Sequence, residues 1–136
     1  MSNEAMDQHA LNSGRTFTWH ELYVPDEVAA GEFYTEALGF GTQDHAMADG
    51  SNYKMLTKDG HAVCGVWSTK NPQMEDTPAH WAVYLAVDDL DARLEKCVSL
   101  GASVVVPAMD IPEVGRMAMI ADPQGAHIWL YKSAHA

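Results

Sequence analysis

An internal repeat constrains this chain more than any other feature of its sequence. At an offset of 63 residues, four pairs match in the same order: Leu22 with Leu85, Val24 with Val87, Asp26 with Asp89, and Asp59 with Asp122. A repeat of this length in a chain of 136 residues predicts two copies of one small structural module.

The first copy has the pattern of a strand, a helix and three further strands. Residues 17–24 are rich in β-branched and aromatic side chains and stop at Pro25, which predicts a strand. Asp26 is a suitable N-cap and Gly39 a suitable C-terminal cap for a helix with apolar side chains at helical spacing. The three strands that follow are expected near residues 41–48, 52–58 and 61–67.

The second copy repeats this order. Residues 80–87 predict a strand, Asp88 and Asp89 begin a helix, and Gly101 ends it. Three strands are expected at residues 104–106, 116–121 and 126–131. The expected organisation is a mobile tail (1–15), a first module (16–68), a linker (69–79) and a second module (80–133). We therefore expect an α+β fold in which two βαβββ modules form a curved, mostly antiparallel sheet around a cup-shaped pocket.

The charge of the chain limits its partners. Eight basic and 19 acidic residues give a net charge of −11, which repels phosphate backbones and anionic lipids. We therefore expect no nucleic-acid or membrane partner. No apolar run is long enough for a membrane span, and residues 1–15 lack the pattern of a secretory signal. Cys64 and Cys97 do not have metal-binding spacing, and a cytoplasmic location is expected.

Three blocks of sequence resemble the vicinal oxygen chelate superfamily, which includes glyoxalase I, bleomycin-resistance proteins and extradiol dioxygenases. The blocks are WHELYVPD with EFYTEALG (19–26, 32–39), YLAVDDLD with LGA (84–91, 100–102), and DIPEVGRMAMIADPQGA (110–126). The third block is similar to a subgroup of hydroxylase-like and glyoxalase-like proteins of unassigned activity. Because one scaffold hosts many chemistries, the resemblance implies the fold and the pocket but not the substrate. It also implies a homodimer, with the modules closing within one chain or swapping between two.

The metal ligands implied by the resemblance are missing from this sequence. The first-strand ligand of the family lies seven residues before the helix-capping Asp, where this chain has Trp19 and Ala82. The last-strand ligand lies four residues after the turn Gly, where it has Trp129 and Cys64, with Val66 as the alternative to Cys64. Indole and methyl groups do not bind divalent cations, and one thiolate is not a zinc site. We expect no bound metal and no other cofactor.

Strand parity predicts which side chains face the pocket. The inward set is Trp19, Glu21, Tyr23, Cys64, His80, Ala82, Tyr84, His127, Trp129 and Tyr131, with Arg116 added from the third block. An aromatic wall with a few ionisable groups suits a small-molecule ligand. Burial between the tryptophans would raise the pKa of Glu21 and suit it to general-base catalysis, and His127 is the second candidate proton-transfer group.

Several of these residues also have structural interpretations. Trp19 and Trp129 could fill the cup as core, Glu21 could be a solvated rim residue, and His80 a solvated edge histidine. His127 could be a buried neutral imidazole bonded to a tyrosine. Arg116 could bind an anionic substrate or pair with surface carboxylates.

Two metal-binding alternatives also stay open at this point. His20 should face the helix, but a register error of one residue would turn it into the pocket, where it could bind a metal. Glu21, His80 and His127 could form an unconventional metal site.

Two functions therefore compete. The first is a glyoxalase-like enzyme that acts on a small organic metabolite without the usual metal, with Glu21 or His127 moving the proton. The second is a protein of the bleomycin-resistance kind, which sequesters a cationic small molecule through its negative charge and aromatic walls. The sequence leaves open whether the protein is an enzyme.

Overall fold

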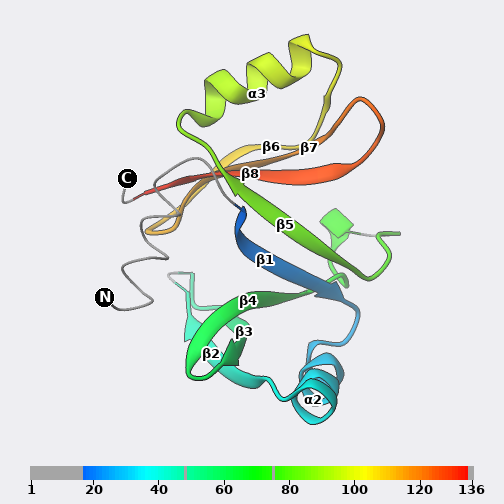
Figure 1. Cartoon of the computed structure of the whole chain (residues 1–136), viewed down its shortest axis with the longest axis vertical. Helices are drawn as coiled ribbons and strands as arrows, with labels where there is room; N and C mark the ends of the chain where they lie inside the picture. The colour runs from blue at the N-terminus through cyan, green and yellow to red at the C-terminus, as the bar shows by residue number, and fades with distance from the viewer. Residues whose placement is uncertain (1–16, 48, 75, 135–136) are drawn as a thin grey trace. The chain divides into compact units, whose positions relative to one another are not determined.

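The computed structural model describes residues 17–47, 49–74 and 76–134. Contacts divide them into two compact units, an N-terminal unit (residues 19–82) and a C-terminal unit (residues 17–18 and 83–134). Figure 1 follows the elements along the chain. They are β1 (Phe17–Val24), α2 (Glu27–Leu38), β2 (Gly41–Ala46), β3 (Asn52–Lys58), β4 (His61–Ser68), η1 (Pro72–Met74), β5 (His80–Ala86), α3 (Leu90–Ser99), β6 (Ser103–Ile111), β7 (Gly115–Ala121) and β8 (His127–Ser133).

The N-terminal unit packs α2 against strands ordered β2-β3-β4-β1. β1 runs parallel to β4, and the other two pairs are antiparallel. The Asp26 carboxylate accepts a hydrogen bond from the Ala29 amide at 3.0 Å, and Gly39 ends the helix in the left-handed region, as the sequence predicts. The core beneath α2 consists of Leu56, Cys64 and Val66, with Val24, Tyr34 and Phe40 packed against them.

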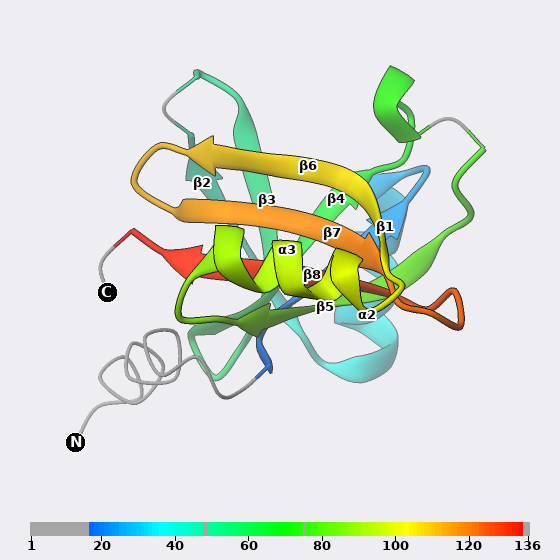
Figure 2. The same ribbon diagram turned by 90° about the horizontal axis from the view of Figure 1, so that it is seen from above.

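The C-terminal unit repeats this plan with strands ordered β5-β8-β7-β6. β5 runs parallel to β8, and α3 lies along one face of β6, β7 and β8, as both ribbon views show (Figure 1, Figure 2). The Asp89 carboxylate caps α3 by accepting from the Ala92 amide at 3.1 Å. Val87, Leu90, Ala118 and Leu130 form the core beneath this helix.

The structure confirms the expected α+β fold and the order of elements in both βαβββ modules. The strand expected at residues 104–106 is longer and runs from Ser103 to Ile111, through two irregularities in its pairing with β7. The expected linker contains η1, and the expected tail lies outside the described residues. The cup-shaped pocket and the limits of the expected domains stay predictions. Neither helix in the described part of the chain has the length and apolar character needed to span a membrane.

Candidate functional site

A buried carboxylate is the main candidate for chemistry in this protein. Glu21, near the middle of β1, is only 5% exposed. The Tyr53 hydroxyl lies 2.8 Å from Glu21 Oε1 and 2.9 Å from Oε2. The Trp19 indole Nε1 donates to the Tyr53 oxygen at 3.0 Å and lies 3.3 Å from Glu21 Oε1. The carboxylate is therefore held by aromatic hydrogen-bond donors rather than by a cation.

The register of three strands explains how these side chains meet. Gly65 of β4 pairs with Glu21 of β1 on one side and with Met55 of β3 on the other. Side chains alternate along a strand, so Tyr53 lies on the same face as Met55, Gly65 and Glu21. We call this face, turned away from α2 and carrying Trp19, Glu21, Tyr53, Gly65 and Trp67, the distal face.

Gly65 is the residue that makes room for the cluster. A Cβ atom at this position would overlap both the Tyr53 hydroxyl and the Glu21 Oε2 atom. Beside it, the Trp67 ring packs on Tyr53 with 5.4 Å between ring centroids, and its indole also hydrogen-bonds Glu21. A glycine in the middle of a strand often marks such a close approach.

Burial changes the ionisation of the cluster. Loss of solvent raises the pKa of Glu21 to about 7, although hydrogen bonds from Tyr53, Trp67 and Trp19 act in the opposite direction. Burial and the adjacent Glu21 charge raise the pKa of the Tyr53 hydroxyl, so it remains a phenol. Glu21 can therefore take up and release a proton near neutral pH, with Tyr53 as a constant donor.

The remaining candidates of the N-terminal unit form a smaller aromatic contact. The His80 ring stacks on Tyr23 with centroids 5.0 Å apart, and its Nδ1 lies 2.8 Å from the Pro78 carbonyl oxygen. Tyr23 is buried, whereas His80 and Ala82 are half-buried. His80 is therefore not the fully solvated edge residue considered from the sequence.

In the C-terminal unit, an aromatic pair occupies the repeat-related position. Tyr84 of β5 and Trp129 of β8 stack with centroids 5.1 Å apart and an interplanar angle of 7°. Trp129 Nε1 is buried and has no hydrogen-bond partner in the described part of the chain. The Tyr131 hydroxyl donates to the Val114 carbonyl at 2.7 Å, and burial raises its pKa.

Two placements differ from expectation in the same unit. His127 is exposed at the first residue of β8, so the interpretation as a buried imidazole bonded to a tyrosine is wrong. Arg116 donates to Asp110 and to Asp91 of α3, each at 3.0 Å, which places it on the helix-facing side. Of its two possible roles, the structure therefore shows the pairing with surface carboxylates.

Cys64 also lies on the opposite side from the one expected. It packs with Leu56 and Val66 beneath α2, where burial raises the pKa of its thiol to about 11. The reason is the hairpin turn, which is two residues long at Asp59 and Gly60 but five residues long at 122–126. Glu21 pairs with Gly65 just as Tyr84 pairs with Trp129, so Gly65 is the true counterpart of Trp129.

The donor atoms in these positions do not fit the metal that the family resemblance implies. Gly65 has no side chain, and the Trp19 indole is a hydrogen-bond donor already directed at Glu21 and Tyr53. Within residues 17–47, 49–74 and 76–134, no group of three or more His, Cys, Asp and Glu side chains could hold a metal ion. His20 lies on the helix-facing side with Leu38 and Phe40, so the alternative register is wrong.

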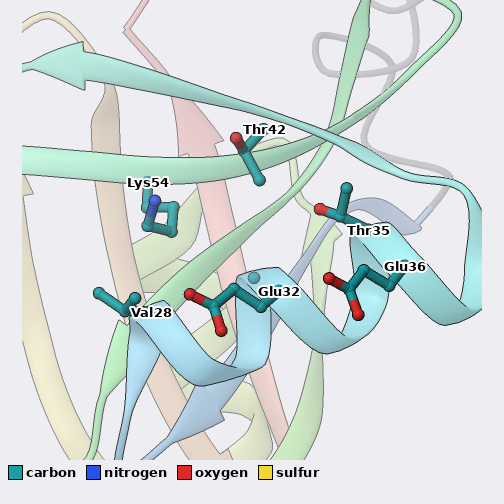
Figure 3. A pocket seen from close by; sticks show the side chains of 7 residues that line it. Val28, Glu32, Thr35, Glu36, Thr42 and Lys54 are labelled. Carbon is teal, nitrogen blue, oxygen red and sulfur yellow. The ribbon is translucent and has the colours of Figure 1, made fainter.

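Two hollows lie on the helix-facing side of the N-terminal unit. The first, of about 230 Å³, lies between α2 and strands β2 and β3, with Glu32 and Glu36 on one side and Thr42 and Lys54 on the other (Figure 3). The second, of about 500 Å³, is lined by His20, Leu38, Phe40, Lys58, Val63, Cys64 and Trp81. Neither includes Glu21 or Trp129, and the aromatic-walled pocket stays a prediction.

Parity alone missed Tyr53, Gly65 and Trp67. Tyr53 was missed because the inward set contained no residue from the second or third strand of the first module. Gly65 and Trp67 were missed because Cys64, their neighbour in β4, was assigned to the wrong face. The isolated glycine at position 65, inside the apolar stretch AVCGVW (62–67), was the available signal.

Comparison with known proteins finds a matching family model and several curated relatives. The Glyoxalase/Bleomycin resistance protein/Dioxygenase superfamily model matches residues 16–130. The chain is 39% identical over 119 residues to the putative glyoxylase CFP32 of Mycobacterium tuberculosis, covering 87% of this chain and 46% of that protein. It is 32% identical over 120 residues to the anthracycline biosynthesis protein DnrV of Streptomyces peucetius, covering 79% and 43%. This chain thus spans less than half the length of these curated relatives.

Solved structures agree at the level of the fold. Methylmalonyl-CoA epimerase from Mycobacterium tuberculosis superposes with a TM-score of 0.60 at 21% identity, covering 88% of this chain and 91% of that chain. A hypothetical protein from Bacillus halodurans gives a TM-score of 0.60 at 11% identity, covering 85% and 91%.

Proposed function

The chain belongs to the Glyoxalase/Bleomycin resistance protein/Dioxygenase superfamily, and we propose that it is an enzyme in which Glu21 moves a proton on a small organic substrate without a bound metal. The observation that carries this proposal is the buried Glu21 carboxylate, with its pKa near 7 and its aromatic hydrogen-bond donors. A catalytic base is most effective when its pKa lies near the working pH.

The chemistry follows from the charge states of the cluster. The Glu21 carboxylate would accept a proton from a substrate carbon acidified by an adjacent carbonyl group, leaving the electron pair on the substrate. Protonated Glu21 is neutral and therefore suits its buried position. The same proton would then return to the substrate, at the original or a neighbouring atom, which restores the carboxylate. Tyr53 keeps its proton throughout and orients Glu21.

Access to Glu21 must come past an aromatic side chain, because the carboxylate itself is 5% exposed. Trp67 contacts the cluster and is 41% exposed, which makes it the side chain of the distal face best placed to move. Within the N-terminal unit we assign Tyr23, which lies on the same face of β1 as Glu21, to the substrate pocket. In the C-terminal unit, Tyr84, Trp129 and Tyr131 stay predicted ligand contacts, and His127 stays the second proton-transfer candidate. A cytoplasmic homodimer belongs to the same proposal.

Capture of a cationic molecule is the rival function, and Glu21 argues against it. A carboxylate with a pKa near 7 carries its charge only part of the time at neutral pH. Its oxygens also already accept hydrogen bonds from Tyr53 and Trp19. A cation site would instead need a carboxylate that stays ionised.

Deuterium exchange tests the proposal directly. Small ketones, hydroxyketones and thioesters are incubated with the protein in D2O, and loss of the carbon-bound proton is followed by NMR. We expect exchange of one class of compound to fall at least about 100-fold in Glu21→Gln, and to be unchanged in Glu32→Gln, whose carboxylate is exposed.

Two outcomes would contradict the proposal. Exchange that survives in Glu21→Gln would remove Glu21 as the base. Exchange that disappears after dialysis against EDTA and returns with added zinc, nickel, manganese or iron would overturn the metal-free mechanism.

A further inference from the structure

The second hollow of the N-terminal unit is a candidate binding site separate from Glu21. It lies on the helix-facing side of the sheet and has a volume of about 500 Å³. Sites for small ligands commonly have volumes of about 300–1,000 Å³. Its residues come from β1, the end of α2, the turn after it, and strands β3, β4 and β5.

Its walls expose more apolar surface than packing requires. Leu38 is 56% exposed, Trp81 48% and Val63 38%, although the Trp81 ring meets the edge of Tyr34 with centroids 5.5 Å apart. Single exposed apolar residues are common, but a contiguous group around a hollow indicates a contact surface. Phe40 and Cys64 connect the lining to the core beneath α2.

One cationic side chain, Lys58, lies among these apolar residues. Lys58 Nζ is 5.8 Å from the centroid of the Phe40 ring and 3.5 Å from the Gly39 carbonyl oxygen. Lys54 and Arg116 pair with carboxylates, whereas Lys58 has no ion pair within the described ranges. An ammonium group has three N–H donors, so Lys58 can donate to a further acceptor. His20 supplies a second polar group in the lining.

We propose that this hollow binds a small carboxylate with an apolar body, its carboxylate on Lys58 and its apolar part against Leu38, Phe40 and Trp81. The lining contains no Asp or Glu, so no carboxylate of the site repels an anion at Lys58. An anion without an apolar body would leave the walls exposed. The combination therefore selects amphipathic carboxylates over either simple ions or neutral apolar molecules.

The probe for this site is 4-phenylbutyrate, with 4-phenylbutanol as its uncharged counterpart. Binding is followed by two-dimensional NMR, in which the indole N–H signal of Trp81 reports on the hollow and those of Trp19 and Trp129 report elsewhere. We expect the Trp81 signal to shift saturably with 4-phenylbutyrate and at least tenfold more weakly with the alcohol. Lys58→Gln should weaken binding of the acid at least tenfold, whereas Lys54→Gln, in the first hollow, should not.

Three results would overturn the site. These are equal affinity for acid and alcohol, binding unaffected by Lys58→Gln in a variant with a wild-type circular dichroism spectrum, and shifts confined to Trp19 or Trp129. A fourth contradicting result would come from analytical ultracentrifugation. If a second copy of the chain covers Trp81, the protein sediments as a dimer, and Leu38→Ser dissociates it. None of these results depends on Glu21 catalysis, so the two proposals fail separately.

Discussion

Tyr53 reaches Glu21 across an intervening strand. The two residues belong to β3 and β1, which are separated by β4, yet the Tyr53 hydroxyl lies 2.8 and 2.9 Å from the two Glu21 oxygens. The side chain passes over Gly65, the one position of β4 at this level that has no side chain to block it. The buried carboxylate therefore depends on a glycine with which it shares no polar contact.

Removal of the Tyr53 hydroxyl should raise the pKa of Glu21 above its value of about 7. The hydrogen bond from Tyr53 stabilises the ionised carboxylate, and Tyr53→Phe removes it while keeping the ring. Carbon-13 NMR of the glutamate side-chain carboxyls measures the pKa. Tyr34→Phe, in the core beneath α2, should leave it unchanged. A lower pKa in Tyr53→Phe would show that the hydroxyl does not stabilise the charge.

The stability of the protein should fall as the pH rises from about 4.5 to about 7. Folded Glu21 has a pKa near 7 and the unfolded residue one near 4.5, so in this window the folded state binds more protons. The contribution of Glu21 to the free energy of unfolding is therefore greatest below pH 4.5, and about 3 kcal/mol of it is lost by pH 8. Urea unfolding of the wild type and of Glu21→Gln at several pH values measures the difference.

The comparison with Glu21→Gln isolates this contribution from other titrations. The glutamine variant should lack this loss. Its free energy of unfolding, relative to that of the wild type, should therefore rise between pH 4.5 and pH 7. Glu32→Gln, in which an exposed carboxylate is lost, should follow the wild-type profile. Parallel profiles for the wild type and Glu21→Gln would mean that Glu21 ionises normally in the folded state.

The fold was predictable because its signals are local and repeated. Asp26 and Asp89 cap their helices, as the sequence indicated, because each carboxylate accepts a hydrogen bond from the backbone amide three residues later. Parity also placed Glu21 and Tyr23 correctly on the face opposite Leu22 and Val24. These assignments need only the period of a strand and the position of a cap.

The site was less predictable because it depends on register between strands. Tyr53 and Glu21 are 32 residues apart, and only the pairing of both strands with β4 brings them together. The counting that placed Cys64 on the distal face failed since the first hairpin turn is shorter than its repeat, and a shift of one residue reverses the face. Sequence spacing does not reveal such a shift when the two turns differ in length.

Gly65→Ala should destabilise the protein by about 2–3 kcal/mol. The added methyl group would overlap the ends of both Tyr53 and Glu21, so the hydrogen bonds of the buried Glu21 carboxylate would have to rearrange around it. Chemical denaturation measures the loss, and the altered Trp19 environment should appear in the fluorescence spectrum. Wild-type stability in Gly65→Ala would mean that Tyr53 does not cross the strand at this point.

Gly31→Ala should have the opposite effect to Gly65→Ala and stabilise the protein by about 0.5–1 kcal/mol. Gly31 lies in the interior of α2, where glycine is costly relative to alanine. A Cβ atom there would meet Thr42 and Lys54 side-chain carbons at 3.8 and 3.9 Å, which are ordinary contacts. Measured in the same denaturation experiment, Gly31→Ala is the matched control for Gly65→Ala. Destabilisation by Gly31→Ala would indicate that α2 packs closer to β2 and β3 than these distances allow.

Arg116→Met should lower the melting temperature in low salt but not in high salt. Arg116 joins Asp91 of α3 to Asp110 of β6, and its side chain is 35% exposed, so salt screens both ion pairs. Melting curves at low ionic strength and in about 1 M sodium chloride, where the screening length is about 3 Å, separate this effect from packing. Asp91→Asn should act in the same direction, and the deuterium exchange that depends on Glu21 should be unaffected by either change. A loss of that exchange in Arg116→Met, with an unchanged melting temperature, would instead assign Arg116 to the binding of an anionic substrate.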